Sequence, residues 1–298
     1  MNFTKKLRIG TGLGLVCLGV VLGTALRFWL MLRCFDYDTG FYTDGGAAAW
    51  LSLLLPVLLA LGGAWCFFRC KRGFAAYRRE RDLPSGALAA FSGLIFLYTG
   101  FALTSDYAAF RGAGFSQFET AQQGFVHLSL LAMCWAFGLV QLLAAAGFFA
   151  GRNLFARAPL LYVLAVLWGM ANLVAAYVFY ARSSSFVENF CTVGGGAALL
   201  LGLFYACRMF AGVGEPAAAL RLFVTGGVAA VLVIPYHLAN LVLALMGRTY
   251  EGEMPALFSL CIAAAGVFLL VLMAGYARTS LDPNGSSTCV YHKLHARP

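Results

Sequence analysis

The chain has few charged residues. Only 11% of its 298 residues are Asp, Glu, Lys or Arg, whereas a soluble domain usually carries about 25%. So few charges cannot cover the surface of a soluble globule of this size. The shortage therefore excludes a soluble fold and indicates that lipid surrounds most of the chain.

Signatures of catalysis and metal binding are also missing. The sequence contains no His-Glu-x-x-His, no Gly-x-Ser-x-Gly and no phosphate-binding glycine loop. Asp36, Asp38 and Asp44 lie close together, but their spacing does not match the twelve-residue calcium loop. We therefore predict no metal and no cofactor. An enzyme acting on lipid-linked substrates, with Arg27 and these aspartates as its candidates, ranks last among the functions considered.

Long apolar blocks make up most of what is present. A helix needs about 20 residues to cross a bilayer, and backbone in contact with lipid must satisfy its hydrogen bonds within the segment. The blocks therefore predict an all-α transmembrane bundle over residues 1–278, followed by a polar, disordered cytoplasmic tail at 279–298. The eight predicted spans are 9–32, 45–68, 86–105, 126–150, 158–181, 189–210, 220–246 and 256–277.

The charges divide unequally between the two sets of connections. One set holds sixteen basic and four acidic residues, a net charge of +12, and the other holds five basic and eight acidic residues, a net charge of −3. Basic connections remain in the cytoplasm, so we predict that both termini are cytoplasmic. The apolar run at 9–32 is longer than a signal-peptide core, which favours an uncleaved first span. The brevity of the chain and its lack of eukaryotic sorting signals suggest the plasma membrane of a bacterium.

The basic connection at 69–81 is the densest group of positive charge. Six of its residues are Lys or Arg, with Phe74 and Tyr77 among them. Such clusters attract anionic lipid head groups. It adjoins two spans and contains no nucleic-acid-binding module, so we predict the bilayer and not nucleic acid as its partner.

Polar side chains within the spans are costly in hydrocarbon, so they mark candidate functional positions. Five of them lie about 4–10 Å outward of the midpoints of their spans at 1.5 Å per residue, whereas Gln141 lies inward. The five are Arg27, Thr99, Asn172, His237 and Asn240. Together they predict a polar, ligand-binding cavity in the outer half of the membrane.

Two spans contain a proline near their centre. Pro235 precedes His237 and Asn240, which are three residues apart and share a helix face. Pro56 has no polar neighbour of this kind. Proline removes a helical hydrogen bond and kinks the helix, so we expect a ligand or proton site beside Pro235 and a packing kink at Pro56. The alternative for His237 is a structural hydrogen bond to a neighbouring helix.

Arg27 is unusual because it lies below the outer surface, where arginine is disfavoured. It could pair with an aspartate of the following loop, bind an anionic group such as a lipid phosphate or a carboxylate, or extend towards the interface. Cys34 and Cys191 both fall near this surface, and whether they form a disulfide is left open.

The first span carries small residues at helical spacing, namely Gly10, Gly14, Gly19 and Gly23. Glycines one turn apart let two helices approach closely. We expect their partner to be another span of the same chain, and the alternative is a second membrane protein.

These observations favour a transporter-like or solute-binding bundle, whose ligand is a small solute or an anionic lipid. The alternative is a non-catalytic membrane subunit, scaffold or sensor that acts through a partner protein. The short connections and the lack of charge at the centres of the spans favour this alternative.

Overall fold

The computed structural model describes residues 3–44, 46–77, 80–112, 121–180, 186–250 and 253–281. Eight helical segments in these ranges are long and apolar enough to cross a membrane, in the places that the sequence predicts. The observed third segment is longer than predicted, at Leu83–Ala109. The sixth begins at Phe186, three residues before the predicted start at 189. The predicted tail lies outside the described residues beyond position 281.

Six of the eight segments are single helices. They are α1 (Phe3–Arg33), α2 (Ala47–Arg69), α3 (Leu83–Gly112), α4 (Ala121–Ala150), α8 (Ala217–Leu245) and α9 (Ala256–Thr279).

The fifth and sixth segments are composite. In the fifth, a short 3-10 turn, η3 (Pro159–Tyr162), leads into α5 (Val163–Ala175), which continues into a π-helical stretch, η4 (Ala176–Tyr180). In the sixth, α6 (Phe186–Asn189) passes through a second π-helical stretch, η5 (Phe190–Gly194), into α7 (Gly195–Phe210). A two-stranded hairpin of β1 (Phe35–Asp36) and β2 (Phe41–Tyr42) joins α1 to α2.

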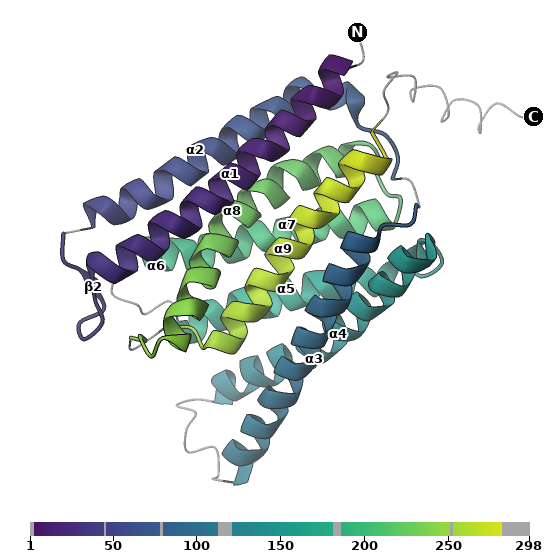
Figure 1. Ribbon diagram of the computed structural model, residues 1–298. Helices are drawn as coiled ribbons and strands as arrows, with labels where there is room; N and C mark the ends of the chain where they lie inside the picture. The colour runs from purple at the N-terminus through teal and green to yellow at the C-terminus, as the bar shows by residue number, and fades with distance from the viewer. Residues whose placement is uncertain are drawn as a thin grey trace, which may run out of the picture.

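The helices form three groups (Figure 1). The α1–α2 hairpin lies on one side, α5, α7, α8 and α9 occupy the middle, and the α3–α4 hairpin lies on the other side. α1 begins and α9 ends at the same end of the bundle, which we call the terminal end. The opposite end, where the β1–β2 hairpin lies, we call the hairpin end.

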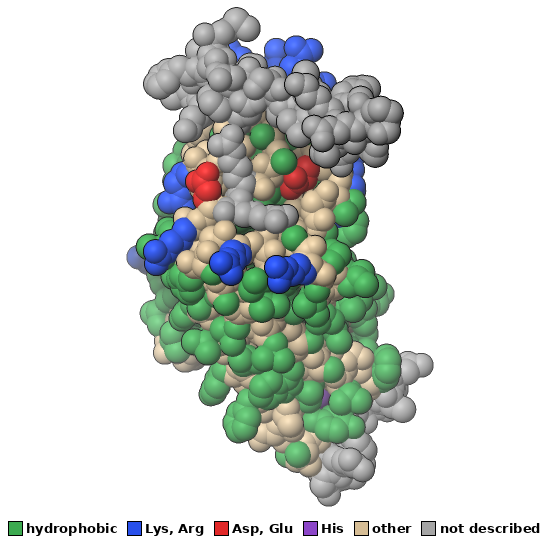
Figure 2. Space-filling view, turned by 90° about the vertical axis from the view of Figure 1, so that its right-hand side faces the viewer, with side chains coloured by type: hydrophobic (Ala, Val, Ile, Leu, Met, Phe, Trp, Pro, Cys, Tyr) green, Lys and Arg blue, Asp and Glu red, His purple; other side chains and the backbone are tan. Residues whose placement is uncertain are grey.

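The outer surface suits a lipid environment. Large apolar side chains such as Leu51, Leu58 and Trp65 of α2 are exposed. Figure 2 shows a band of hydrophobic side chains bordered by Lys and Arg towards the terminal end. An apolar band of this kind would not be stable in water, so the chain is a multi-pass membrane protein.

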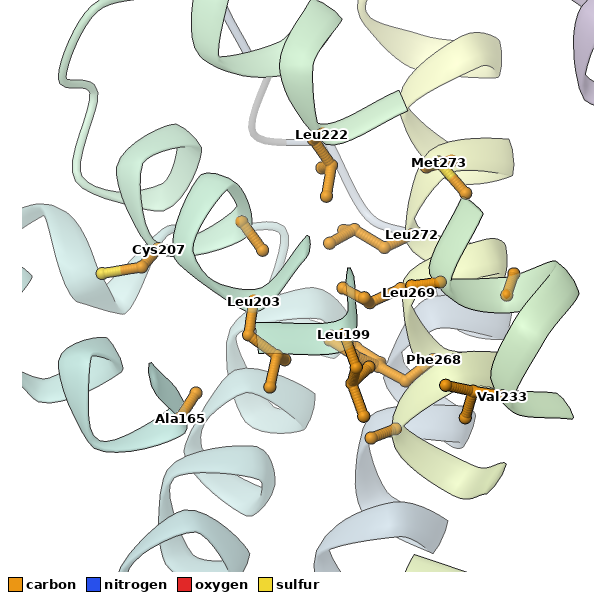
Figure 3. Close-up of a cluster of buried hydrophobic side chains, with 14 of the residues drawn as sticks. Ala165, Leu199, Leu203, Cys207, Leu222, Val233, Phe268, Leu269, Leu272 and Met273 are labelled. Carbon is orange, nitrogen blue, oxygen red and sulfur yellow. The ribbon is translucent and has the colours of Figure 1, made fainter. Parts of the chain in front are cut away.

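The core lies where the middle helices meet. Leu203 of α7, Leu222 of α8 and Leu269 of α9 belong to one buried cluster (Figure 3). Nearly every residue of α8 from Gly226 to Asn240 is buried. The α1–α2 hairpin packs against α8, whereas the α3–α4 hairpin packs against α9 and α5.

The glycines of α1 divide into two pairs. A Cβ at Gly19 would lie 3.2 Å from Val231 of α8 and 3.3 Å from the Pro56 carbonyl oxygen of α2, and Gly23 is equally confined. A Cβ at Gly10 or Gly14 would meet no atom of the described residues within 4 Å. The expectation that all four pack against another span of this chain is therefore wrong for Gly10 and Gly14, because α1 turns that face away from α2 and α8.

Candidate functional site

A buried ion pair joins α1 to α6 near the hairpin end. Arg27 donates from Nη1 to Oε1 of Glu188 at 2.5 Å and from Nη2 to Oε2 at 2.6 Å. Their side chains are 6% and 1% exposed. Two parallel hydrogen bonds between a guanidinium and a carboxylate fix both distance and orientation. The pair therefore fixes the position of α1 relative to the sixth span.

Three further side chains complete what we call the Arg27–Glu188 cluster. Arg27 Nη1 donates to Tyr42 Oη at 2.7 Å, and Nη2 donates to Asn240 Oδ1 at 3.3 Å. Tyr42 Oη in turn donates to Glu188 Oε1, and Tyr250 Oη donates to Oε2 at 3.4 Å. Burial raises the pKa of Tyr42 and of Tyr250, so both hydroxyls keep the protons that they donate. The cluster ties together α1, β2, α6, α8 and the α8–α9 connection.

The loop that carries Tyr42 is shaped by its own aspartates. Asp36 accepts from Thr39 Oγ1 at 2.7 Å and from the backbone N–H of Asp38 at 3.1 Å. The bond from Thr39 is the main cause of a lowered pKa for Asp36. Asp44 accepts from the backbone N–H groups of Gly46 and Ala48 at the start of α2, and the bond from Ala48 lowers its pKa. Both aspartates are therefore occupied within the loop.

These contacts decide between the alternatives for Arg27. Its partner is Glu188 and not an aspartate of the loop, and at 5% exposure Arg27 does not extend to the interface. The placement of Glu188 also changes. Sequence hydropathy placed Glu188 in the outer connection, whereas the sixth helical segment begins two residues earlier.

A small cavity of about 30 Å³ lies beside Arg27. That is space for about two water molecules. Its lining is Gly23, Arg27, Ser52, Leu53, Pro56, Val187, Cys191, Val231, Leu232, Pro235 and Tyr236. Arg27 Nε is buried and has no hydrogen-bond partner among the described residues. A charged donor thus borders the cavity with one N–H unused.

Both central prolines border this cavity. A Cβ at Gly23 would lie 3.0 Å from Pro235 Cγ and 3.1 Å from Pro56 Cγ, so α1 fits between the two prolines only because residue 23 is glycine. Proline offers no N–H to the carbonyl four residues earlier. The carbonyls of Ser52 and Val231 therefore lack their helical donor, and both residues line the cavity.

The π-helical stretch η5 contributes two side chains to the cavity and its surroundings. An extra residue per turn rotates the side chains that follow, and such stretches are frequent at functional sites. Cys191 lines the cavity, while Thr192 Oγ1 donates to Tyr236 Oη at 3.1 Å. The Arg27 guanidinium lies over the Tyr236 ring, with Cζ 4.8 Å from the ring centroid.

The predicted polar residues do not form one group. Arg27 and Asn240 come together, but His237 lies 3.2 Å from Ser259 Oγ of α9 and does not line the cavity. Thr99 also reaches α9, with Oγ1 2.9 Å from Cys261 Sγ. His237 and Asn240 share one helix yet have different neighbours, because α9 and α1 lie on different sides of α8.

Asn172 and Gln141 lie apart from the cluster. Asn172 is a buried residue of α5. Gln141 of α4 is fully buried, and neither of its amide atoms has a partner among the described residues. Neither residue lines the cavity beside Arg27.

Two cysteines that the sequence placed near the outer surface lie close to the cluster. Cys34 and Cys191 pack in the same apolar group near the hairpin end, but both are free thiols. Among the residues that the structure describes, no three His, Cys, Asp or Glu side chains are grouped so that they could hold a metal ion.

Sequence reasoning missed Glu188, Tyr42 and Tyr250. A usable signal existed, because Arg27 and Glu188 are opposite charges at the outer boundaries of two spans.

Comparisons with protein-family models, with curated proteins and with solved structures find no match to this chain.

Proposed function

We propose that the chain is a plasma-membrane protein that binds or transports a small solute at the Arg27–Glu188 cluster and the cavity beside it. The charge distribution supports cytoplasmic termini, which would turn the hairpin end and its cluster towards the outside.

The observation that carries this proposal is the unused Nε–H of a buried arginine at the edge of a cavity. Ionisable groups within membrane spans are expensive and usually functional. A buried ion pair is also weak evidence for a purely stabilising role, because apolar replacements are often as stable. A ligand that accepts from Nε would give the arginine a use that the ion pair alone does not.

Native mass spectrometry of the protein in mild detergent tests this. Cys191→Leu would fill the cavity, and Cys207→Leu is its matched control, since Cys207 lies on the same span, is equally buried at 7% and does not line the cavity. We expect wild type and Cys207→Leu to retain a small molecule that Cys191→Leu loses. The same retained molecules in all three proteins would contradict the proposal.

A second function rests on a different observation, the open face of α1. Gly10 and Gly14 are exposed, and no other described residue would lie within 4 Å of a Cβ at either position, which supports docking of a helix from a partner protein. Gly14→Leu should then release a companion that copurifies with wild type, while leaving the thermal stability of this chain unchanged. A wild-type protein that carries no companion after gentle extraction counts against it.

A further inference from the structure

The charges around the cavity cancel. Arg27 is the charged residue in its lining, and both terminal nitrogens of that guanidinium are bound to Glu188. An anion that entered would bring an unbalanced charge into a poorly hydrated site, and a cation would lie against the guanidinium. An uncharged ligand meets neither cost.

The unused buried atoms of the cluster are donors. Within the described residues, Arg27 Nε and Asn240 Nδ2 have no hydrogen-bond partner. Of these two residues, Arg27 lines the cavity and Asn240 does not. A buried donor without a partner is costly, so a molecule at this site should offer an acceptor oxygen to Nε.

Two other residues of the lining have carbonyls without a helical donor, and most of the rest of the lining is apolar. The carbonyls of Ser52 and Val231 lack helical donors because of Pro56 and Pro235. Most of the remaining lining is apolar, with Leu53 and Leu232 among it. A group with one polar side and a compact apolar body fits such a lining.

We infer that the cavity takes an uncharged, planar carbonyl group, an amide or an ester, whose oxygen accepts from Arg27 Nε. This inference rests on the proposed function and specifies its ligand class. The carbonyl belongs either to a small solute that enters from water or to the acyl ester of a bilayer lipid.

Three probes of nearly equal shape separate the charge classes: acetamide, acetate and acetamidinium. Each is titrated into the detergent-solubilised protein while the melting temperature, Tm, is recorded for wild type, Cys191→Leu and Cys207→Leu. Subtracting the response of Cys191→Leu removes general solvent effects. At concentrations about tenfold above its Kd, acetamide should raise Tm by about 2–4 °C in wild type and Cys207→Leu, with no rise from the two ions.

Repeating the titration in nanodiscs of dioleoylphosphatidylcholine identifies the source of the carbonyl. A Tm rise that persists in the nanodisc indicates a solute from water. A rise seen in detergent and lost in the nanodisc indicates that the lipid ester already occupies the cavity. Both results support the uncharged class.

Other results separate the two proposals. If acetate or acetamidinium raises Tm more than acetamide does, and this rise is absent in Cys191→Leu, the ligand class is wrong and the solute-binding function stands. If no probe has an effect that depends on Cys191 and native mass spectrometry finds no retained molecule, both fail. Cys191→Val, with Cys207→Val as its control, replaces the leucine pair if either leucine variant does not fold.

Discussion

Two arginine–carboxylate pairs lie at opposite ends of the bundle, in opposite surroundings. Arg27 and Glu188 are 6% and 1% exposed, and further polar side chains surround them. Arg278 and Asp82, at the terminal end, join α9 to the residue before α3 at 3.1 Å and are 56% and 11% exposed. Both pairs join a guanidinium to a carboxylate, but the buried pair has two hydrogen bonds and the terminal pair has one, so they differ in burial and in geometry.

Burial makes removal of one partner expensive. Water can solvate Asp82 if Arg278 is lost, so that exposed pair adds little stability. Neither member of the Arg27–Glu188 pair can be solvated in this way, and a lone buried charge is strongly destabilising. The buried pair therefore specifies how α1 packs against the sixth span. The exposed pair lies beside the contact between α9 and α3, which other residues of these helices make.

The largest expected effect comes from Glu188→Gln. The substitution keeps the shape of the side chain but leaves the Arg27 charge without a counter-charge, so we expect a loss of about 3–5 kcal/mol in the free energy of unfolding. Denaturant titration in detergent micelles, followed by tryptophan fluorescence, measures it. The double variant Arg27→Met/Glu188→Met should recover most of the loss, because it buries no charge. A cost below about 1 kcal/mol for Glu188→Gln would show that the pair is not desolvated.

Sequence and structure agree where the information is local. Each span was predictable because about 20 consecutive apolar residues decide it without reference to the rest of the chain. The positions of Pro56 and Pro235 within two spans were predictable for the same reason, and both prolines lie inside helices. What could not be predicted was that both prolines border one cavity with Gly23 between them, since that depends on which helices are neighbours.

The Arg27–Glu188 pair likewise depends on which helices are neighbours, so the local sequence does not predict it. Its members are separated by 161 positions in the sequence, and Glu188 lies so close to the start of its span that hydropathy assigns it to a loop. His237 makes the same point. The sequence left open a ligand or proton site and a structural hydrogen bond to a neighbouring helix, and the contact of His237 Nδ1 with Ser259 Oγ of α9 is of the second kind. A polar residue in a span marks a helix contact, and only the packing decides which contact it is.

A smaller effect is expected from Tyr42→Phe, which sharpens the comparison within one loop. Tyr42 hydrogen-bonds both charged members of the cluster, and bonds to charged groups contribute about 1.5–3 kcal/mol. Tyr37 Oη donates to the neutral carbonyl of Met31 at 3.0 Å, so Tyr37→Phe should cost about 0.5–1.5 kcal/mol. The same denaturant titration compares them. Equal costs would mean that the charges beside Tyr42 add nothing to its hydrogen bonds.

The next effect depends on pH and concerns Glu253, next to the cluster in the chain's α8–α9 connection. Partial burial raises its pKa to about 7. The folded state therefore binds more protons than the unfolded state between about pH 4.5 and 7, and stability falls as pH rises through this window. We expect Glu253→Gln to remove about 1 kcal/mol of that fall, a value reduced for the partial exposure of the side chain. Thermal melts of both proteins from pH 4.5 to 8 measure the difference, and parallel pH profiles would contradict it.

The smallest effect is expected from Arg278→Met at the terminal end. Among the described residues, the exposed guanidinium donates one hydrogen bond to Asp82, and Asp82 retains its bond from Ser85 Oγ when the arginine is lost. We expect a cost of at most about 1 kcal/mol, which 1 M salt should reduce further because salt screens exposed charges. Denaturant titration at low and high salt gives both numbers. Equal losses in the free energy of unfolding for Arg278→Met and Glu188→Gln would mean that burial does not distinguish the two pairs. The burial of the Arg27–Glu188 pair would then no longer mark it as a functional site.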